Sequence, residues 1–393
     1  MKKLKVFETF AGIGAQHKAL SNIFNNKTII DKFKLNKKTF EIVGTSEWYI
    51  EAIIAYDAIH HGNQSLYIEE TNFNMKDMLT FIKKFSLSKD SKDLYEFSKI
   101  EKLPENKIKQ LYIALKRNKN YGSIVDIKAK DLPFIDLLTY SFPCTDISNA
   151  GQGKGLSKCN QNGSCSTRSG LLWEIERILL EMKELNRLPK FLLMENVKAL
   201  LSEKHYKDWL EFEKVLESLG YRNSMIVLNA QDFGIPQTRE RIFCVSELNG
   251  KTNINIRNWN RFNSNLGDFL DIDEIKYQKE YEECIPNNTP SRIKTFDLNT
   301  KLTKDSKFVN TITTKQDRSP NAGNFYYDNN LDGKAKFRFI TPRECLMLMG
   351  FDKEDYDKLK EINMKNEEIY KQTGNSIVVQ KLEAIFIEIL SKF

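Results

Sequence analysis

The chain has 393 residues, of which 40% are hydrophobic and 11% aromatic, so it can form one large domain and a smaller one around a substantial core. Its net charge of +7 permits a polyanionic partner without requiring one. Six cysteines are too few for a disulfide scaffold, the start MKKLKVFETF lacks the apolar stretch of a signal peptide, and no apolar run reaches the roughly 18 residues of a membrane span. We therefore expect a soluble, cytoplasmic protein with no membrane partner.

Short apolar runs alternate with amphipathic helical patterns over the first two-thirds of the chain. Leu171, Ile175 and Ile178 recur at helical spacing, for example. This alternation predicts an α/β fold with a doubly wound, mostly parallel sheet, whose ligands bind beyond the carboxyl ends of the strands. The expected strands are Leu4–Phe10, Glu41–Glu47, Ile135–Phe142, Phe191–Val197, Met225–Asn229 and Arg241–Ser246.

Two segments break this alternation. Residues from about 62 to 121 are polar, Lys-rich and largely helical in pattern, which indicates an insert. From Gly250 to about Lys336 the pattern dissolves into short polar runs, which indicates a smaller, irregular and helix-free domain. Between Ser291 and Arg343 there are eleven Lys and Arg against five Asp and Glu. A solvated face would explain any one charge run, but this concentration favours contact with a polyanion.

A glycine-containing loop, Phe10-Ala11-Gly12-Ile13-Gly14, joins the first expected strand to a helix. Glycine there allows a sharp turn and a close approach of a ligand, although a tight turn alone would also need it. His17 occupies the third glycine position of a dinucleotide-binding loop, which argues against a dinucleotide. Glu47-Trp48 ends the second strand and suits a ribose and an adenine ring. A nucleoside ligand without a pyrophosphate is therefore favoured.

Cys144 follows Pro143 directly after the third long strand and opens a Gly-rich loop that runs from Thr145 to Ser169. Most cysteines are small buried hydrophobes, but a thiol at this edge of the sheet can act as a nucleophile. Glu195 ends the next strand and should lie at the same edge. Alone it would be a simple strand-end carboxylate, whereas beside a cysteine it can serve as an acid.

Arg239 and Arg241 alternate on entry to a further strand, so they should point to one face and grip a phosphate and a carboxylate. An exposed strand edge would show the same pattern. No metal site is expected, because the four histidines lack metal-binding spacing and Cys159 and Cys165 have no second pair.

Together these segments resemble the DNA (cytosine-5)-methyltransferase family of restriction–modification systems and phages, over nearly the whole chain and in the family's order. Two departures are Thr145, where the family usually has glutamine, and Thr311-Ile312, where it has Thr-Leu. The matching segments are the Phe10–Gly14 loop, Glu47-Trp48, Asp126-Ile127, Pro143-Cys144, Arg168 to Arg177, Glu195-Asn196-Val197, Gln237-x-Arg239-x-Arg241, Arg343-Glu344 and Gly374-Asn375-Ser376.

The resemblance implies the S-adenosylmethionine-dependent methyltransferase fold, with a catalytic domain at 1–248, a target-recognition domain at 249–345 and a segment at 346–393 that returns to the catalytic domain. The implied catalytic residues are Cys144, Glu195, Arg239 and Arg241. The implied cofactor site comprises Phe10, Ala11, Gly12, Ile13, Gly14, Glu47, Trp48, Asp126, Ile127, Pro143, Leu171, Asn375 and Ser376. The implied DNA contacts are Ser148, Arg168, Thr311, Lys315, Gln316 and Arg318.

The resemblance also implies the activity, which is methyl transfer from S-adenosylmethionine to C5 of a flipped-out cytosine in a specific double-stranded DNA sequence. The chain is then a monomer in restriction–modification or phage DNA protection, and a separately encoded restriction endonuclease is a candidate partner. A tRNA cytosine-5 methyltransferase of the same fold is the main alternative, although the basic segment between Arg241 and Arg343 favours DNA. A nicotinamide-dependent oxidoreductase and a catalytically inactive DNA-binding regulator are further alternatives.

Overall fold

The computed structural model describes residues 2–62, 74–143, 168–251, 256, 262–272 and 275–393. The chain separates into two compact units. Unit 1 comprises residues 1–228, 240–256 and 385–393, and unit 2 comprises residues 229–239 and 257–384. These units describe packing, so the functional division at residues 248 and 345 stays a prediction.

Unit 1 is built on a six-stranded sheet with the strand order β2-β1-β3-β4-β6-β5. β1 pairs in parallel with β2 and β3, and β3 pairs in parallel with β4, whereas β6 is antiparallel to β4. The doubly wound, mostly parallel sheet is therefore confirmed, with all six expected strands. Their bounds are β1 Lys2–Thr9, β2 Lys38–Ser46, β3 Leu137–Tyr140, β4 Phe191–Val197, β5 Tyr221–Asn229 and β6 Glu240–Leu248.

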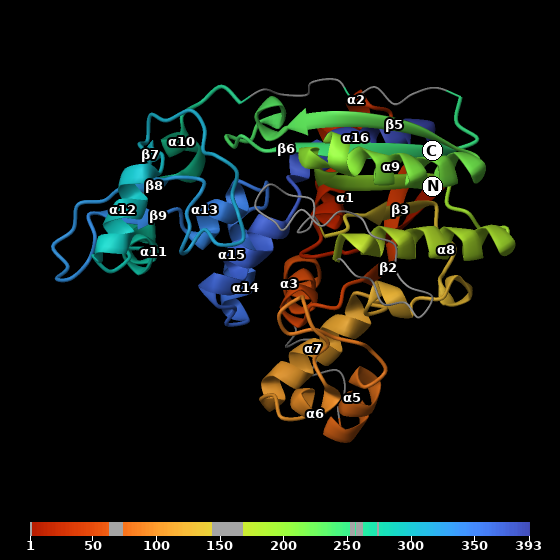
Figure 1. Cartoon of the computed structure of the whole chain (residues 1–393), viewed down its shortest axis with the longest axis horizontal. Helices are drawn as coiled ribbons and strands as arrows, with labels where there is room; N and C mark the ends of the chain where they lie inside the picture. The colour runs from red at the N-terminus through yellow and green to blue at the C-terminus, as the bar shows by residue number, and fades with distance from the viewer. Residues whose placement is uncertain (1, 63–73, 144–167, 252–255, 257–261, 273–274) are drawn as a thin grey trace. The chain divides into compact units, whose positions relative to one another are not determined.

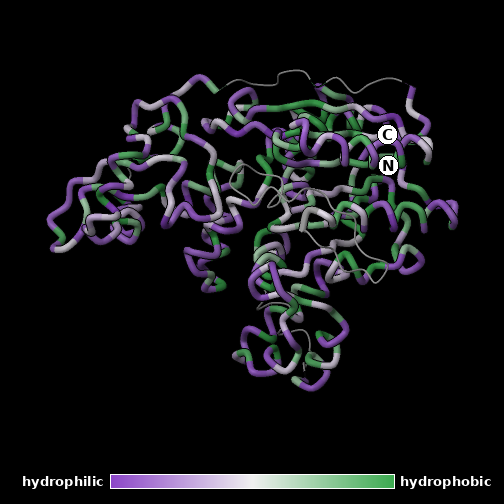
Figure 2. The backbone as a smooth tube through the Cα atoms, in the orientation of Figure 1, coloured by the Kyte–Doolittle hydropathy of each residue, from purple (hydrophilic) through white to green (hydrophobic). Residues whose placement is uncertain are grey.

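The apolar runs form strands because both faces of the sheet are covered. All four residues of β3 are buried, and Phe191 to Met194 of β4 are buried as well. One hydrophobic cluster joins these strands to α8 (Leu172–Glu184) and α9 (Glu203–Ser218), which lie in front of the sheet in Figure 1. The backbone of the central strands is accordingly coloured as largely hydrophobic in Figure 2.

The strand order reverses beside β1. The chain leaves β1 for β2 on one side and later returns to β3 on the other, so β1 and β3 are neighbours. In open α/β sheets the crevice at such a reversal, outside the carboxyl ends of the strands, is where ligands bind. The loop after β1 and the segment after β3 both begin at this point. The topology therefore brings the two predicted chemical segments to one edge of the sheet.

The segment expected to be a helical insert contains α5 (Met75–Ile82), α6 (Phe97–Ile100) and α7 (Glu105–Arg117). α7 packs against α5 and against α3 (Ile50–His61), as Figure 1 shows. On α3, Asp57 is fully buried and forms an ion pair with Arg117 of α7 at 3.0 Å. The remaining helices of this part of unit 1 are α1 (Ala15–Asn25) and α2 (Lys27–Lys32), and the C-terminal part of α16 (Val379–Lys392) also belongs to unit 1.

Unit 2 contains short helices in the segment that was expected to be helix-free, so that expectation is wrong. The reason is length, because helices of five to nine residues are too short to show a helical period in the sequence. The helices in that segment are α10 Leu266–Leu270, α11 Gln278–Glu283 and α12 Pro290–Leu298. Unit 2 also contains α13 Pro342–Met347, α14 Lys353–Glu361 and α15 Asn366–Asn375, and a small sheet of β7 Lys301–Leu302, β8 Asn324–Tyr326 and β9 Phe337–Phe339.

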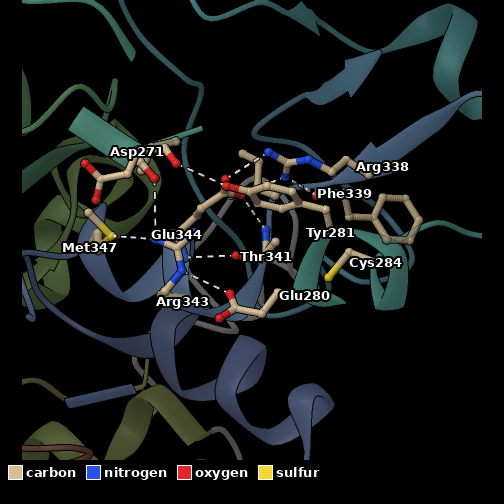
Figure 3. Close-up of polar contacts among 12 residues, drawn as sticks. Asp271, Glu280, Tyr281, Cys284, Arg338, Phe339, Thr341, Arg343, Glu344 and Met347 are labelled. Carbon is tan, nitrogen blue, oxygen red and sulfur yellow. Dashed lines mark hydrogen bonds and ion pairs between the residues drawn. The ribbon is translucent and has the colours of Figure 1, made fainter. Parts of the chain in front are cut away.

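A buried ion pair holds β9 to the start of α13 in unit 2 (Figure 3). The Arg338 guanidinium donates two hydrogen bonds to the Glu344 carboxylate, at 2.8 and 2.9 Å, and lies 4.3 Å from the ring centre of Tyr281. Glu344 also accepts a hydrogen bond from the backbone amide of Thr341, whose hydroxyl in turn caps α13. Arg343 extends the network to Glu280 of α11 at 3.0 Å.

Glu344→Ala should therefore lower the free energy of unfolding by about 3–5 kcal/mol, because it leaves the buried Arg338 guanidinium without its anion. Denaturant unfolding measures this. Asp328→Ala is the matched control, because it removes the partner of Lys336 from an ion pair that is 55% and 74% exposed. Its effect should stay within about 1 kcal/mol. Equal losses in the two variants would contradict a special role of the buried pair.

Candidate active site

The glycine loop after β1 has an unusual backbone. Gly12 and Gly14 have φ angles of 54° and 76°, and Phe10 itself has φ 54°. A bulky residue in the left-handed region is strained, and such strain is typically held in place at functional sites. The side chain of Phe10 packs against the hydrophobic cluster of unit 1. α1 begins directly after Gly14, so the loop forms a tight strand-to-helix turn as the sequence predicted.

Glu47 joins this loop to the end of β2. Its carboxylate accepts hydrogen bonds from the backbone amides of Gly12 at 3.0 Å, Trp48 at 2.9 Å and Tyr49 at 2.9 Å. A Cβ atom added at Gly12 would meet nothing within 4 Å, so the backbone there is open to a close approach. A fixed carboxylate beside an open glycine backbone fits a nucleoside ligand, as expected for S-adenosylmethionine.

The two glycines give a matched pair of substitutions. Gly14→Ala should lower the free energy of unfolding by about 3–5 kcal/mol, since it combines positive-φ strain with a clash. Its Cβ would lie 2.3 Å from His60 Nε2 and 2.6 Å from Tyr56. Gly12→Ala has the φ strain without the clash and should cost about 1–2 kcal/mol. Thermal or denaturant unfolding of each variant without ligand measures the loss. If Gly12→Ala lowered the free energy of unfolding as much as Gly14→Ala, this ranking would be contradicted.

Other predicted cofactor residues are spread around this edge. Trp48 is half-buried, Asp126 is exposed at the end of a short 3-10 helix, and Ile127 is buried. Asp126 and Ile127 line an open depression together with Lys128, Glu174 and Arg177 of α8, and the glycine loop does not contribute to it. Leu171 packs against the hydrophobic cluster of unit 1. The structure therefore joins Glu47 to the glycine loop directly, whereas Asp126 and Ile127 line the depression beside α8.

Glu195 and Arg241 are brought together by the antiparallel pairing of β4 and β6. Glu195 lies opposite Phe243 and Arg241 lies opposite Val197, so the two polar residues are diagonal neighbours on one face of the sheet. Their closest atoms, Glu195 Oε1 and Arg241 Nε, are 3.5 Å apart. Both side chains are nearly enclosed, with 12% and 15% of their surfaces exposed. The Glu195 carboxyl group and the Arg241 guanidinium therefore form a nearly enclosed ion pair.

Asn196 connects this pair to the segment that carries the predicted nucleophile. Its buried side-chain amide donates a hydrogen bond of 3.1 Å to the carbonyl of Phe142, one residue before Pro143. Sequence reasoning assigned Asn196 no role, although an amide directly after a strand-end carboxylate was a usable signal. Cys144 and Ser148 lie outside the described residues. The structure thus anchors the chain up to Pro143 beside Glu195.

Arg239 makes different contacts from Arg241. Its guanidinium is buried in unit 2 and donates to the carbonyls of Ile312 at 2.9 Å, Gly374 at 3.0 Å and Ser376 at 2.8 Å. Gln237 binds the backbone amide of Ile312, since its Oε1 accepts a hydrogen bond from that amide at 3.0 Å. In this structure Arg239 therefore ties backbone segments of unit 2 together, which differs from the expected phosphate contact on a face shared with Arg241. The expectation that Arg239 and Arg241 share one face assumed that both lie in a strand, but β6 begins at Glu240 and Arg239 precedes it.

Gly374 packs directly against the same segment of unit 2. A Cβ at this glycine would lie 2.3 Å from the backbone nitrogen of Thr314. Ser376 is buried and Asn375 is exposed. Their predicted role in cofactor binding stays a prediction.

The predicted DNA-contacting residues have different exposures. Lys315 and Arg318 are exposed, and the Thr311 hydroxyl donates to the carbonyl of Thr238 at 2.6 Å. Gln316 is fully buried and bonds to the backbone of Ala322 and Gly323 at 3.3 and 3.4 Å, so it shapes its own loop in this structure and does not face solvent. Polarity alone could not distinguish it from its exposed neighbours. Arg168 begins a short 3-10 helix.

No group of three His, Cys, Asp or Glu side chains among the described residues is arranged to hold a metal ion. No helix in the described part of the chain is long and apolar enough to cross a bilayer.

The sheet and the residues at its strand ends define an α/β enzyme of the methyltransferase class, and comparison with known proteins identifies the family. A family profile described as C-5 cytosine-specific DNA methylase matches residues 73–391, and the chain belongs to this family. It is 37% identical to the type II methyltransferase M2.ScrFI of Lactococcus lactis subsp. cremoris, over 98% of this chain and 99% of that protein. It is 36% identical to the orphan methyltransferase M.SssI of Spiroplasma monobiae, over 99% of this chain and 97% of that protein.

A solved structure shows the same fold at lower identity. The Dnmt2 methyltransferase of S. pombe superposes with a TM-score of 0.63 at 18% identity, and covers 99% of this chain and 98% of its own. The chain is therefore an enzyme, a DNA (cytosine-5)-methyltransferase, as the resemblance of its motifs implied.

Proposed function

We propose that this chain transfers a methyl group from S-adenosylmethionine to C5 of a flipped-out cytosine within a specific sequence of double-stranded DNA. The observation that carries the proposal is the Glu195–Arg241 pair, with Asn196 holding Phe142 immediately before Pro143-Cys144. This arrangement supports an acid and a nucleophile acting on one pyrimidine ring. The Phe10–Gly14 loop and Glu47 are proposed to bind the cofactor at the neighbouring strand end.

The chemistry needs these residue types because C5 of cytosine is a weak nucleophile. The Cys144 thiolate adds to C6, and the electron pair of the C5–C6 bond becomes available at C5. Glu195 donates a hydrogen bond to N3 and stabilises the ring as charge develops, while Arg241 orients its carboxyl group. S-adenosylmethionine, when bound, would supply a sulfonium methyl group to C5 and would leave as S-adenosylhomocysteine. Loss of the C5 proton then expels the Cys144 sulfur and restores the ring.

The target base is buried in the duplex, so it must leave the stack before it can react. Flipping costs a few kcal/mol, which contacts to the DNA backbone have to offset. We propose that residues 249–345 read the sequence, that residues 346–393 complete the cofactor site through Asn375 and Ser376, and that Ser148 and Arg168 contact the backbone. The exposed Lys315 and Arg318 are the cationic candidates in the recognition segment.

DNA affinity is expected to fall steeply as the salt concentration rises, because cationic side chains displace counterions from phosphates. Lys315→Ala and Arg318→Ala should each reduce the slope of log affinity against log salt by about 1 if they contact phosphate. Fluorescence anisotropy with a labelled duplex measures the slope. Lys353→Ala, a basic residue of α14 outside the proposed recognition segment, is the control. An unchanged slope in both recognition variants would remove them from the interface.

Bisulfite sequencing of DNA from a host that expresses the chain tests the proposed function and identifies the modified site in one experiment. Methylation of purified duplex DNA but not of tRNA is expected, and the reverse result would favour the tRNA alternative. We further propose that the chain acts as a cytoplasmic monomer in DNA protection, with any partner restriction endonuclease encoded separately.

A further inference from the structure

The underside of the glycine loop rests on two side chains of α3. His60 Nε2 lies 3.0 Å from the carbonyl oxygen of Ile13, inside the loop. A carbonyl only accepts hydrogen bonds, so His60 carries a proton on Nε2 and donates it. Gly14 has no room for a Cβ because His60 and Tyr56 occupy that space, at 2.3 and 2.6 Å. Two successive residues of the loop, Ile13 and Gly14, therefore lie against α3.

These two side chains belong to a longer chain of contacts, in which Glu8 and Tyr56 are buried and the two imidazoles are partly buried. The imidazole of His17 stacks on that of His60, with ring centres 4.2 Å apart and planes at 11°. His17 Nδ1 lies 3.0 Å from the Tyr56 hydroxyl, which lies 2.8 Å from Oε2 of Glu8. Glu8 is completely buried in β1. We refer to Glu8, His17, Tyr56 and His60 as the loop support.

The loop support works without net charge at neutral pH. Burial raises the pKa of the Glu8 carboxyl to about 8, although the hydrogen bond from Tyr56 opposes the shift. Burial lowers the pKa of His17 to about 3 and that of His60 well below its usual value. Tyr56 donates its hydroxyl proton to Glu8 Oε2, and its oxygen can accept a hydrogen bond from Nδ1 of a neutral His17. Neutral donors and acceptors give a directional framework here, and a charge on the buried Glu8 would be costly.

His17 stands at a position of the loop motif that is usually a glycine. His17 occupies the third glycine position of a dinucleotide-binding loop, where a glycine allows a helix and a strand to pack closely. Here an imidazole fills that place and stacks beneath the loop. A core filler would need only an apolar side chain. Two polar contacts in series, a ring stack and a final hydrogen bond to the Ile13 carbonyl point instead to control of the loop backbone.

We infer that His60 and Tyr56 are positioning residues of the cofactor loop, and that Glu8 and His17 hold these two side chains in the orientation that fixes the backbone of Ile13 and Gly14. The inference rests on the proposed function only in so far as the loop binds S-adenosylmethionine. The order of the loop in the free protein is independent of that assignment.

The first experiment compares His60→Ala, His60→Gln and Asp57→Asn in the full chain. Glutamine places an amide donor near the position of Nε2, so His60→Gln should preserve the bond to Ile13. Asp57 is also buried on α3 but pairs with Arg117 and not with the loop, so Asp57→Asn weakens the same helix as a control. Hydrogen exchange of the amides in residues 10–14 is followed in the free protein, and the affinity for S-adenosylhomocysteine by calorimetry.

His60→Ala should raise loop exchange and weaken S-adenosylhomocysteine binding by about tenfold each, the size expected for one buried hydrogen bond. His60→Gln should restore most of the loop protection and most of the S-adenosylhomocysteine affinity. Asp57→Asn should leave loop exchange and this affinity near the parent values. Equal loop exchange in His60→Ala and Asp57→Asn would overturn the inference, because the loop would then respond only to general weakening of α3. If the parent protein bound no S-adenosylhomocysteine, the proposed function would fail. The hydrogen exchange of the loop in the free protein would still test whether His60 positions it.

A pH series tests Glu8. Because its folded pKa is raised from 4.5 to about 8, the stability it contributes is complete below 4.5 and is lost as the pH rises through 8. Tyr56 from α3 and the backbone of His17 from α1 act on the Glu8 carboxyl, while Thr45 and Thr139 lie opposite it on β2 and β3. His17, His61 and Lys18 act in turn on His60.

Affinity for S-adenosylhomocysteine should therefore fall severalfold between pH 7 and pH 9 in the parent protein. Glu8→Gln retains a neutral donor and acceptor and should bind with the same affinity at both values. A parent protein with constant affinity over this range, or a Glu8→Gln variant that shows the same decline, would remove Glu8 from the loop support.

Discussion

The Cys144→Ala protein is expected to bind S-adenosylmethionine with unchanged affinity and to transfer no detectable methyl group to duplex DNA. Without a thiolate to add to C6, C5 cannot attack a methyl sulfonium, and loss of a covalent nucleophile typically reduces turnover by at least about 10⁴-fold. Single-turnover methylation with radiolabelled cofactor measures the loss, and calorimetry checks cofactor binding. Retained turnover would refute the assignment of the nucleophile.

The other cysteines of the described chain are poor nucleophiles, which sharpens this prediction. Cys244, Cys284 and Cys345 are all buried. Burial raises the pKa of Cys244 and of Cys284 to about 12 and that of Cys345 well above its usual value. Cys284→Ala is thus a suitable control with near-normal turnover. A duplex containing 5-fluorocytosine should trap a covalent adduct at Cys144, and an adduct at any other residue would contradict the mechanism.

Glu195→Gln is expected to slow the chemical step by about 10²- to 10⁴-fold, the usual contribution of a positioned acid. Glutamine keeps the size of the side chain but cannot release a proton to the ring. Single-turnover kinetics with saturating DNA and cofactor isolates this step from binding. DNA and cofactor affinities should remain within a few-fold of the parent values.

Glu240 offers the matched control for Glu195. It lies on β6, the strand that carries Arg241, but is 45% exposed and pairs with Lys198. Glu240→Gln should therefore leave the single-turnover rate unchanged. Arg241→Ala should lower the rate less than Glu195→Gln, because Arg241 acts through the orientation of Glu195. An unchanged rate in Glu195→Gln would remove its role as the acid.

The strands and their chemical residues were readable in the sequence for a physical reason. A strand covered on both faces must be apolar along its length, so β3 and β4 stand out, and polar residues at their ends mark the edge where ligands bind. Glu47 and Glu195 were predicted in this way, and both lie at strand ends of the sheet. The short helices of unit 2 escaped detection because a helix of one or two turns leaves too few apolar repeats.

Some polar residues inside the fold make contacts with partners distant in sequence, which local patterns do not predict. Arg239 and Gln316 carry the same functional groups as DNA-contacting residues, yet their donors bind backbone carbonyls within unit 2. The partners of Arg239 lie 73 to 137 residues away. No local pattern records such a pairing, so burial decided what the composition left open.

The amino-acid sequence by itself determined the class of fold and predicted the edge of the sheet where we propose that the chemistry occurs, because apolar periodicity and strand-end polarity are local properties. The tertiary structure alone decided which polar side chains face solvent and which support the backbone. It showed that Glu47 grips the glycine loop, that Asn196 anchors Phe142, and that Glu8 reaches the loop through three further side chains. These contacts depend on distances between residues far apart in the chain, which only folding brings together.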